Sequence, residues 1–135
     1  TIVAVADDGR VTLLRPGAIS RAEIEGVVGP IAAAHGGAIQ APGMMESHYA
    51  PRARMRLDAD APRDGEAYLA FGAPAPAGGA TLSASGDLVE AAANLYAALR
   101  ALDSTGAEVI AVAKIPAHGL GEAIRDRLAR AAAPR

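Results

Sequence analysis

Two short runs of apolar and β-branched residues open the chain. They cover residues 1–5 and 11–14, and the Asp7-Asp8-Gly9 between them is typical of a tight turn. The two runs therefore predict a β-hairpin.

The next apolar residues follow a helical spacing. Ser20 and Glu23 have the spacing of a capping box, in which the serine hydroxyl accepts from the backbone N–H three residues on and the glutamate reaches back. Gly29-Pro30 is a stop signal, so we expect a helix over residues 21–28. Residues 31–35 are expected to add one short helical turn.

Apolar strands and amphipathic helices alternate in the second half of the chain. Residues 108–113 are almost all apolar, as in a parallel strand that is covered on both faces. Helices are expected from Asp87 to about residue 102 and from Gly119-Leu120-Gly121 to Pro134. Further strands are expected over residues 54–57, 66–71 and 80–83. This order predicts an α/β fold with a small parallel sheet.

Residues 38–52 fit neither a helix nor a strand. An irregular stretch of about 15 residues in a compact protein is usually a functional loop or a linker. Pro42-Gly43 and Pro51 bracket the part of it that contains Met44, His48 and Tyr49. The loop can present His48 and Tyr49 to a ligand, or Tyr49 can anchor the loop by packing. The residues alone leave both interpretations open.

Composition narrows the classes of function. The 135 residues are 51% hydrophobic and 21% charged, which is typical of a globular protein. The chain has no cysteine, which excludes disulfides and thiolate catalysis, and its net charge of −2 gives no overall attraction to nucleic acid. No apolar run approaches the ~20 residues of a membrane span, and no basic leader opens the chain. We therefore expect a cytoplasmic protein.

Arginines and glycines supply further candidates for ligand contact. Arg15 ends a predicted strand before a Pro-Gly turn, where its guanidinium can hold a phosphate or lie on the surface. Arg52, Arg54 and Arg56 share one strand face, which favours a solvated edge strand over a phosphate or RNA patch. Gly119-Leu120-Gly121 can form an anion site at a helix N-terminus, although a tight strand-to-helix turn is favoured.

Metal binding and the common hydrolytic motifs are not indicated. The histidines His35, His48 and His118 are far apart, and none has a partner at ligand spacing. The chain also lacks a nucleophile elbow, a triad order and a paired-carboxylate signature. The residues by themselves predict a small α/β domain with a presented loop, without defining a reaction.

The irregular loop carries a family resemblance. Pro42-Gly43-Met44, followed after three residues by His48-Tyr49-Ala50-Pro51, resembles the linker signature of the Sua5 family, the two-domain L-threonylcarbamoyladenylate synthases. Four further segments resemble the family in the same order, and together they extend over essentially the whole chain. These segments are Thr1-Ile2-Val3 and residues 14–19, 85–103 and 119–128.

This resemblance implies a domain organisation and a reaction. Residues 1–37 would end a YrdC-like catalytic domain, residues 38–54 would be the linker, and residues 55–135 would form a Rossmann-like Sua5 domain. The family joins L-threonine and bicarbonate and adenylates the product with ATP, giving threonylcarbamoyl-AMP and pyrophosphate for the t6A modification of tRNA. ATP would be a substrate, with Mg²⁺, and neither would be tightly bound by these residues.

The resemblance also implies site residues and partners. Arg15 and Tyr49 would bind ATP, whereas Pro42, Gly43, Met44, His48 and Pro51 would shape the linker loop; no catalytic residue and no metal ligand is expected. Met45-Glu46-Ser47 stands where the family often has basic and aromatic residues. The implied partners are the YrdC-like domain, the substrates and further proteins of the t6A pathway, with no membrane and no direct contact to nucleic acid.

Two other functions remain open from the sequence. Residues 55–135 could form a stand-alone nucleotide-binding module that uses the Gly119–Gly121 turn. They could instead form a docking domain for other proteins. Within the Sua5 family, the chain is expected to be a part of a nucleotidyltransferase that is inactive by itself.

Overall fold

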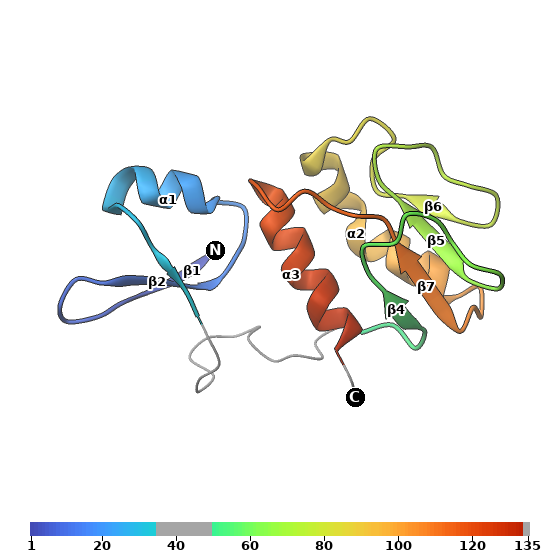
Figure 1. The fold of residues 1–135 in the computed structure, drawn as a ribbon, viewed down its shortest axis with the longest axis horizontal. Helices are drawn as coiled ribbons and strands as arrows, with labels where there is room; N and C mark the ends of the chain where they lie inside the picture. Colours follow the sequence, from blue (N-terminus) through green and yellow to red (C-terminus); the bar gives the residue numbers. More distant parts are fainter. Residues whose placement is uncertain (35–49, 134–135) are drawn as a thin grey trace.

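The computed structural model describes residues 1–34 and 50–133, which form two separate sheets (Figure 1). The first is a three-stranded sheet with the order β1-β2-β3, accompanied by one helix. The second is a four-stranded sheet with the order β4-β7-β5-β6, accompanied by two helices. Helix α3 of the second part is the element that faces the first part (Figure 1).

The N-terminal part begins with the predicted hairpin. Strands β1 (Ile2–Val5) and β2 (Val11–Arg15) pair antiparallel, and Gly9 has a φ of +84° in the turn between them. Helix α1 (Arg21–Val28) begins with the expected capping box. The backbone N–H of Ser20 donates to Glu23 Oε2 at 2.8 Å, and the Ser20 hydroxyl accepts from the Glu23 N–H at 3.3 Å.

The helical turn expected over residues 31–35 is wrong in the part that the structure describes. Ala32–Ala33 form strand β3, which pairs parallel to β2, and the Ala34 N–H donates to the Leu13 carbonyl at 3.1 Å. The free edge of β2 satisfies the backbone groups of this segment, which a single isolated helical turn would leave largely unpaired.

The C-terminal part is the predicted α/β unit with a parallel sheet. Its strands are β4 (Arg54–Arg56), β5 (Ala67–Ala70), β6 (Ala80–Thr81) and β7 (Val109–Val112), and all of their pairings are parallel. The two helices are α2 (Leu88–Asp103) and α3 (Leu120–Ala132). The Asp87 carboxylate caps α2 by accepting from the N–H groups of Val89 and Glu90, at 2.8 and 3.3 Å.

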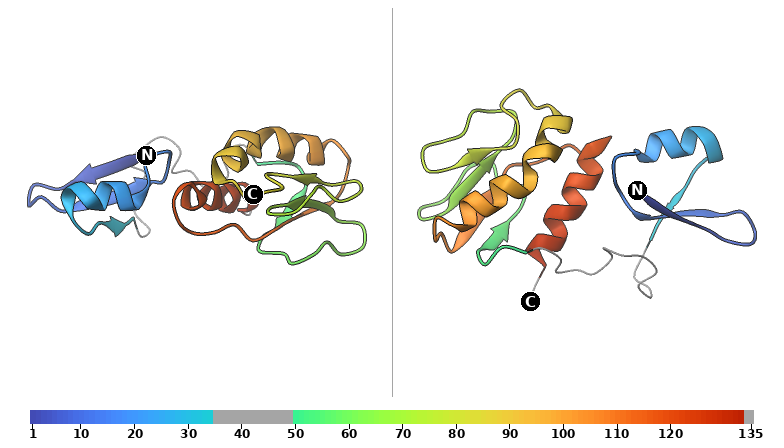
Figure 2. Two further views of the ribbon diagram at one scale, coloured as in Figure 1. Left: turned by 90° about the horizontal axis from the view of Figure 1, so that it is seen from above. Right: turned by 180° about the vertical axis from the view of Figure 1, so that it is seen from behind.

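The hydrophobic core lies between this sheet and its two helices, which run side by side on one face (Figure 2). Leu69 of β5 and Ile110 of β7 are fully buried there, against Leu95 of α2 and Leu128 of α3. Truncating a buried leucine of this kind to alanine typically costs about 2–5 kcal/mol. The core contains no aromatic side chain among its fully buried residues in the described ranges.

The opposite face of the sheet is covered by the loop that joins β4 to β5. Ala111 of β7 is fully buried although it points away from the helices, and Ala59 of the loop is 3% exposed. The Ala59 N–H donates to the Val112 carbonyl at 2.8 Å, and the Tyr68 hydroxyl donates to the Ala59 carbonyl at 3.1 Å. The loop therefore takes the place of the helix layer that usually covers this face of a parallel sheet.

The connections after β4 and β7 leave the sheet on opposite faces. The chain after β4 crosses β7 on the loop-covered face, whereas the chain after β7 leads to α3, which packs over β4 on the helical face. In open α/β sheets, two neighbouring strands whose connections leave on opposite faces have a crevice at their carboxyl ends.

Candidate functional site

Arg15 is the predicted ATP-binding residue that the structure describes. It is the last residue of β2, is half-buried and pairs with Ile2 of β1. The turn that follows it is fixed by Thr1, whose hydroxyl donates to the Ile19 carbonyl at 2.7 Å and accepts from the Ile19 N–H at 3.0 Å. Gly17 is required in this turn, because a Cβ there would lie 2.8 Å from Thr1 Oγ1. The guanidinium of Arg15 therefore extends from a firmly held strand end.

Most of the predicted linker residues lie outside the described residues. These are Pro42, Gly43, Met44, His48 and Tyr49, together with the divergent triplet Met45-Glu46-Ser47. Pro51 is described and is buried. Of the predicted site residues, the structure therefore places Arg15 and Pro51.

The chain continues from Pro51 directly into the C-terminal core. Ala53 is 7% exposed, and its N–H donates to Asp103 Oδ1 at the end of α2, at 2.9 Å. The end of the predicted linker is thus attached to both the edge strand β4 and a core helix.

Arg54 and Arg56 lie on the edge strand β4, as the sequence favoured, whereas Arg52 precedes the strand. Arg54 is exposed, whereas Arg56 forms a two-pronged pair with Glu66, with Nη2 to Oε2 at 2.6 Å and Nε to Oε1 at 3.0 Å. This pair, together with the Arg63 N–H that donates to the same carboxylate, lowers the pKa of Glu66 to about 2. The hydrogen bonds that Arg56 donates to Glu66 in turn raise the pKa of Arg56. Arg56 is therefore part of the scaffold that holds the β4–β5 loop.

The Gly119–Gly121 turn is explained by packing. Gly119 stands at the N-cap position of α3 with a φ of +55°, and a Cβ on Gly121 would collide with the Pro116 carbonyl. The N–H groups of Gly121 and Glu122 donate to the carbonyls of His118 and Gly119, at 2.9 and 3.3 Å. Because these two amides have internal partners, they are not available to an anion.

An ion pair connects the two parts of the molecule. Arg21 of α1 places Nη2 2.8 Å from Glu122 Oε1 in the first turn of α3, and its Nη1 donates to the Ile31 carbonyl at 3.1 Å. Both side chains are less than a third exposed. The sequence did not reveal this pair, because its members are 101 residues apart.

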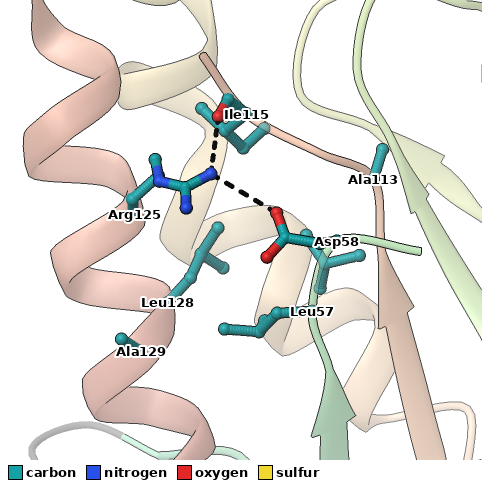
Figure 3. A pocket seen from close by; sticks show the side chains of 8 residues that line it. Leu57, Asp58, Ala113, Ile115, Arg125, Leu128 and Ala129 are labelled. Carbon is teal, nitrogen blue, oxygen red and sulfur yellow. Dashed lines mark hydrogen bonds and ion pairs between the residues drawn. The ribbon is translucent and has the colours of Figure 1, made fainter. Parts of the chain in front are cut away.

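A cavity of about 250 Å³ lies at the carboxyl ends of β4 and β7, beneath α3 (Figure 3). Its polar groups are the side chains of Asp58 and Arg125, and sequence analysis missed both. No local motif marks them: they meet only because β4 and β7 are neighbours in the sheet. Within residues 1–34 and 50–133, no three or more His, Cys, Asp or Glu side chains are grouped closely enough to hold a metal ion. In the same part of the chain, no helix is long and apolar enough to cross a membrane.

Residues 19–133 match the family model described as the C-terminal domain of threonylcarbamoyl-AMP synthase. The chain belongs to this family. It is 37% identical to a Pyrococcus abyssi threonylcarbamoyl-AMP synthase, a match that covers 88% of this chain and 41% of the relative. It is 33% identical to the Bacillus subtilis threonylcarbamoyl-AMP synthase, covering 100% of this chain and 45% of the relative. The chain thus spans less than half the length of these synthases.

Solved structures of the family have the same fold. The crystal structure of P. abyssi Sua5 complexed with L-threonine matches with a TM-score of 0.73 and 31% identity, over 90% of this chain and 42% of that chain. A P. abyssi Sua5 variant in which an adjacent histidine and tyrosine are replaced by alanine matches with a TM-score of 0.69 and 29% identity, over 90% and 41% of the two chains. The resemblance inferred from the linker motif is therefore confirmed for the family and for the α/β fold.

Proposed function

We propose that this chain acts as the C-terminal part of a threonylcarbamoyl-AMP synthase. The complete enzyme would condense L-threonine with bicarbonate and transfer AMP from ATP to the resulting carbamate, releasing pyrophosphate and water. The observation that carries this proposal is the match of residues 19–133 to the C-terminal domain of these synthases. The L-threonine in the matched P. abyssi structure supports the substrate. The product would feed the t6A modification of tRNA.

The surface of residues 1–34 supports their assignment to the end of a larger catalytic domain. Among the described residues, five large apolar side chains on this part are more than a third exposed, namely Val3, Val5, Ile19, Val27 and Val28. Val27 is 85% exposed, and helix α1, on which it lies, has no buried residue. The matched synthases are more than twice as long as this chain, so their remaining sequence is long enough to supply a covering domain. Residues 1–37 would then belong to the catalytic domain, 38–54 to the linker and 55–135 to the second domain.

Arg15 would stabilise the phosphates of ATP in this enzyme. A guanidinium held at a strand end needs little reorganisation to meet the charge that develops as pyrophosphate leaves. The contacts of Thr1 with Ile19 hold the turn after Arg15, which supports such a role. Arg15 would act in binding and charge stabilisation, and no proton transfer is assigned to it.

Tyr49 would close the linker over the bound nucleotide. His48-Tyr49 is the single adjacent His-Tyr pair of this chain, and a matched structure carries alanines in place of such a pair. Pro42 and Pro51 restrict their own backbone and that of the preceding residues, so the segment between them is stiffened. A closed linker would keep water from the acyl adenylate, which hydrolyses readily.

A pyrophosphate assay tests this function. The full-length protein that contains these residues should release pyrophosphate from ATP only when both L-threonine and bicarbonate are present. Residues 1–135 alone should release none, because the resemblance assigns the threonine site and most of the ATP site to the other domain. Substrate-dependent release by the isolated chain, or none by the full-length protein, would contradict the proposal.

A further inference from the structure

The cavity beneath α3 has the composition of a small-molecule site. Its walls are apolar and come from three elements, with Leu57 after β4, Val112 and Ala113 at the end of β7, and Leu128 and Ala129 on α3. Arg125 projects from α3 over this space toward Asp58 and the Ile115 carbonyl (Figure 3). Apolar walls with a few convergent polar groups are typical of ligand pockets in proteins.

The position of the cavity in the fold favours the same interpretation. It lies at the carboxyl ends of the neighbouring strands β4 and β7. The chain leaves the sheet on one face after β4 and on the other face after β7. This is the place where open α/β sheets bind their ligands. The volume of about 250 Å³ is below the range of about 300–1,000 Å³ for drug-sized ligands, so a nucleotide would not fit.

The two charged side chains of the cavity have atoms that can form further hydrogen bonds. Arg125 uses Nη1 for both contacts, with the Ile115 carbonyl at 2.9 Å and with Asp58 Oδ1 at 3.3 Å. The second distance is long for a charge-assisted hydrogen bond, which is usually about 2.7–2.9 Å. Within the described ranges, Nε and Nη2 of Arg125 and Oδ2 of Asp58 have no hydrogen-bond partner. The Arg125 and Asp58 side chains are 38% and 54% exposed, so these remaining polar atoms are open to solvent and to a ligand that enters the cavity.

Asp58 is held in an uncommon backbone conformation. Its φ is +54°, and in the described part of the chain it is the one residue other than glycine with a positive φ. Non-glycine residues in this region often occur at ligand sites, where the surrounding structure fixes them. The Ala59 N–H, bonded to the Val112 carbonyl at 2.8 Å, fixes the turn here and directs the Asp58 carboxylate to Arg125.

We propose that this cavity binds a free α-amino acid with a short aliphatic side chain. The carboxylate of the ligand would pair with Nε and Nη2 of Arg125 in a two-pronged arrangement, and its ammonium would pair with Asp58 Oδ2. Its side chain would lie against Leu57 and Leu128. The inference does not rest on the proposed synthase activity, because residues 57–129 alone form the cavity and neither Arg15 nor Tyr49 takes part.

The test is a titration of L-valine into the isotope-labelled chain of residues 1–135, followed by amide NMR. Saturable shifts should appear at Asp58, at residues 112–115 and near Arg125. Isobutyrate, which lacks the ammonium, and isobutylamine, which lacks the carboxylate, should each bind at least tenfold more weakly. Unchanged spectra at 20 mM valine, or equal binding of isobutyrate, would overturn the proposal.

Substitutions at Asp58 and Arg125 test whether valine binds in this cavity. Asp58→Gly removes the carboxylate while glycine adopts a positive φ without strain, so this variant should fold normally and bind valine at least tenfold more weakly. Arg125→Gln should abolish the shifts. The matched control is Arg130→Gln, which removes an arginine from the same helix where it pairs with Asp126 at 2.9 Å, outside the cavity. Full binding by the folded Asp58→Gly variant, or loss of binding in Arg130→Gln alone, would refute this site.

Discussion

At the scale of single residues, the pair of Arg56 and Glu66 determines how the C-terminal part responds to acid. The pKa of Glu66 is lowered from 4.5 to about 2, first by the hydrogen bonds from Arg56 and then by the Arg63 N–H. A carboxyl group whose pKa is lower in the folded state stabilises the fold above its unfolded pKa. This contribution is lost as the pH falls from about 4.5 toward 2.

We therefore predict that Glu66→Gln removes part of the acid sensitivity of the protein. The variant should be less stable than the wild type at pH 7, and the difference between the two should shrink as the pH falls below about 4. Urea unfolding at pH 7, 5 and 3 measures this. Arg56→Gln should flatten the pH profile in the same way, since it removes the largest cause of the shift. A constant difference between wild type and Glu66→Gln at all three pH values would contradict the prediction.

Replacing two helical glycines by alanine should change the stability of the protein in opposite directions. A Cβ on Gly121 would meet the Pro116 carbonyl, a backbone group that cannot move aside, so Gly121→Ala should destabilise the protein by about 1–3 kcal/mol. Gly26 of α1 has open space around its Cβ position, so Gly26→Ala should be neutral or stabilising by about 0.5–1 kcal/mol. Thermal unfolding of both variants, monitored by circular dichroism, compares them. A Gly121→Ala variant as stable as the wild type would contradict the first of these predictions.

At the scale of helices and strands, local signals were predictable and long-range pairings were not. The capping box of Ser20 and Glu23 and the buried run of β7 were predicted because each depends on neighbouring residues. Strand β3 was missed because its stability comes from pairing with β2, about 20 residues earlier. The cavity was missed for the same reason, since Asp58 and Arg125 are 67 residues apart and meet through the strand order β4-β7-β5-β6.

The ion pair of Arg21 and Glu122 links α1 to α3, and its loss can be predicted at this scale. A partly exposed pair of this kind contributes up to about 1 kcal/mol. Glu122→Gln should therefore leave the core intact and increase amide hydrogen exchange in residues 1–34. In the wild type, β5, β7 and α2 should already be better protected than β1 and α1, because neither β1 nor α1 contains a buried residue. Equal protection from residue 2 to residue 130 in a dilute monomer would refute this.

At the scale of the whole molecule, two parts with different packing are joined through the predicted linker. The C-terminal part has its own continuous core, whereas the N-terminal part exposes apolar side chains such as Val5 and Val27. This contrast agrees with the proposal that residues 1–37 complete a catalytic domain and residues 55–135 fold independently. The sequence predicted a linker here through Pro42, Pro51 and the His48-Tyr49 pair. The exposed surface became visible only in three dimensions.

The last prediction concerns Tyr49 in the linker. It follows from the proposed function and is tested in the full-length protein. If the Tyr49 hydroxyl donates to a charged group of the desolvated nucleotide, its loss removes about 1.5–3 kcal/mol. At about 1.4 kcal/mol per tenfold change in rate, Tyr49→Phe should lower turnover by one to two orders of magnitude. The melting temperature of residues 55–135 should not change, because the hydroxyl would contact the nucleotide and not the core. If Tyr49 instead anchors the loop by packing, Tyr49→Phe should be nearly as active as the wild type and Tyr49→Ala should be less stable. Measuring turnover and thermal unfolding for both variants distinguishes the two roles, because each role changes one property and leaves the other.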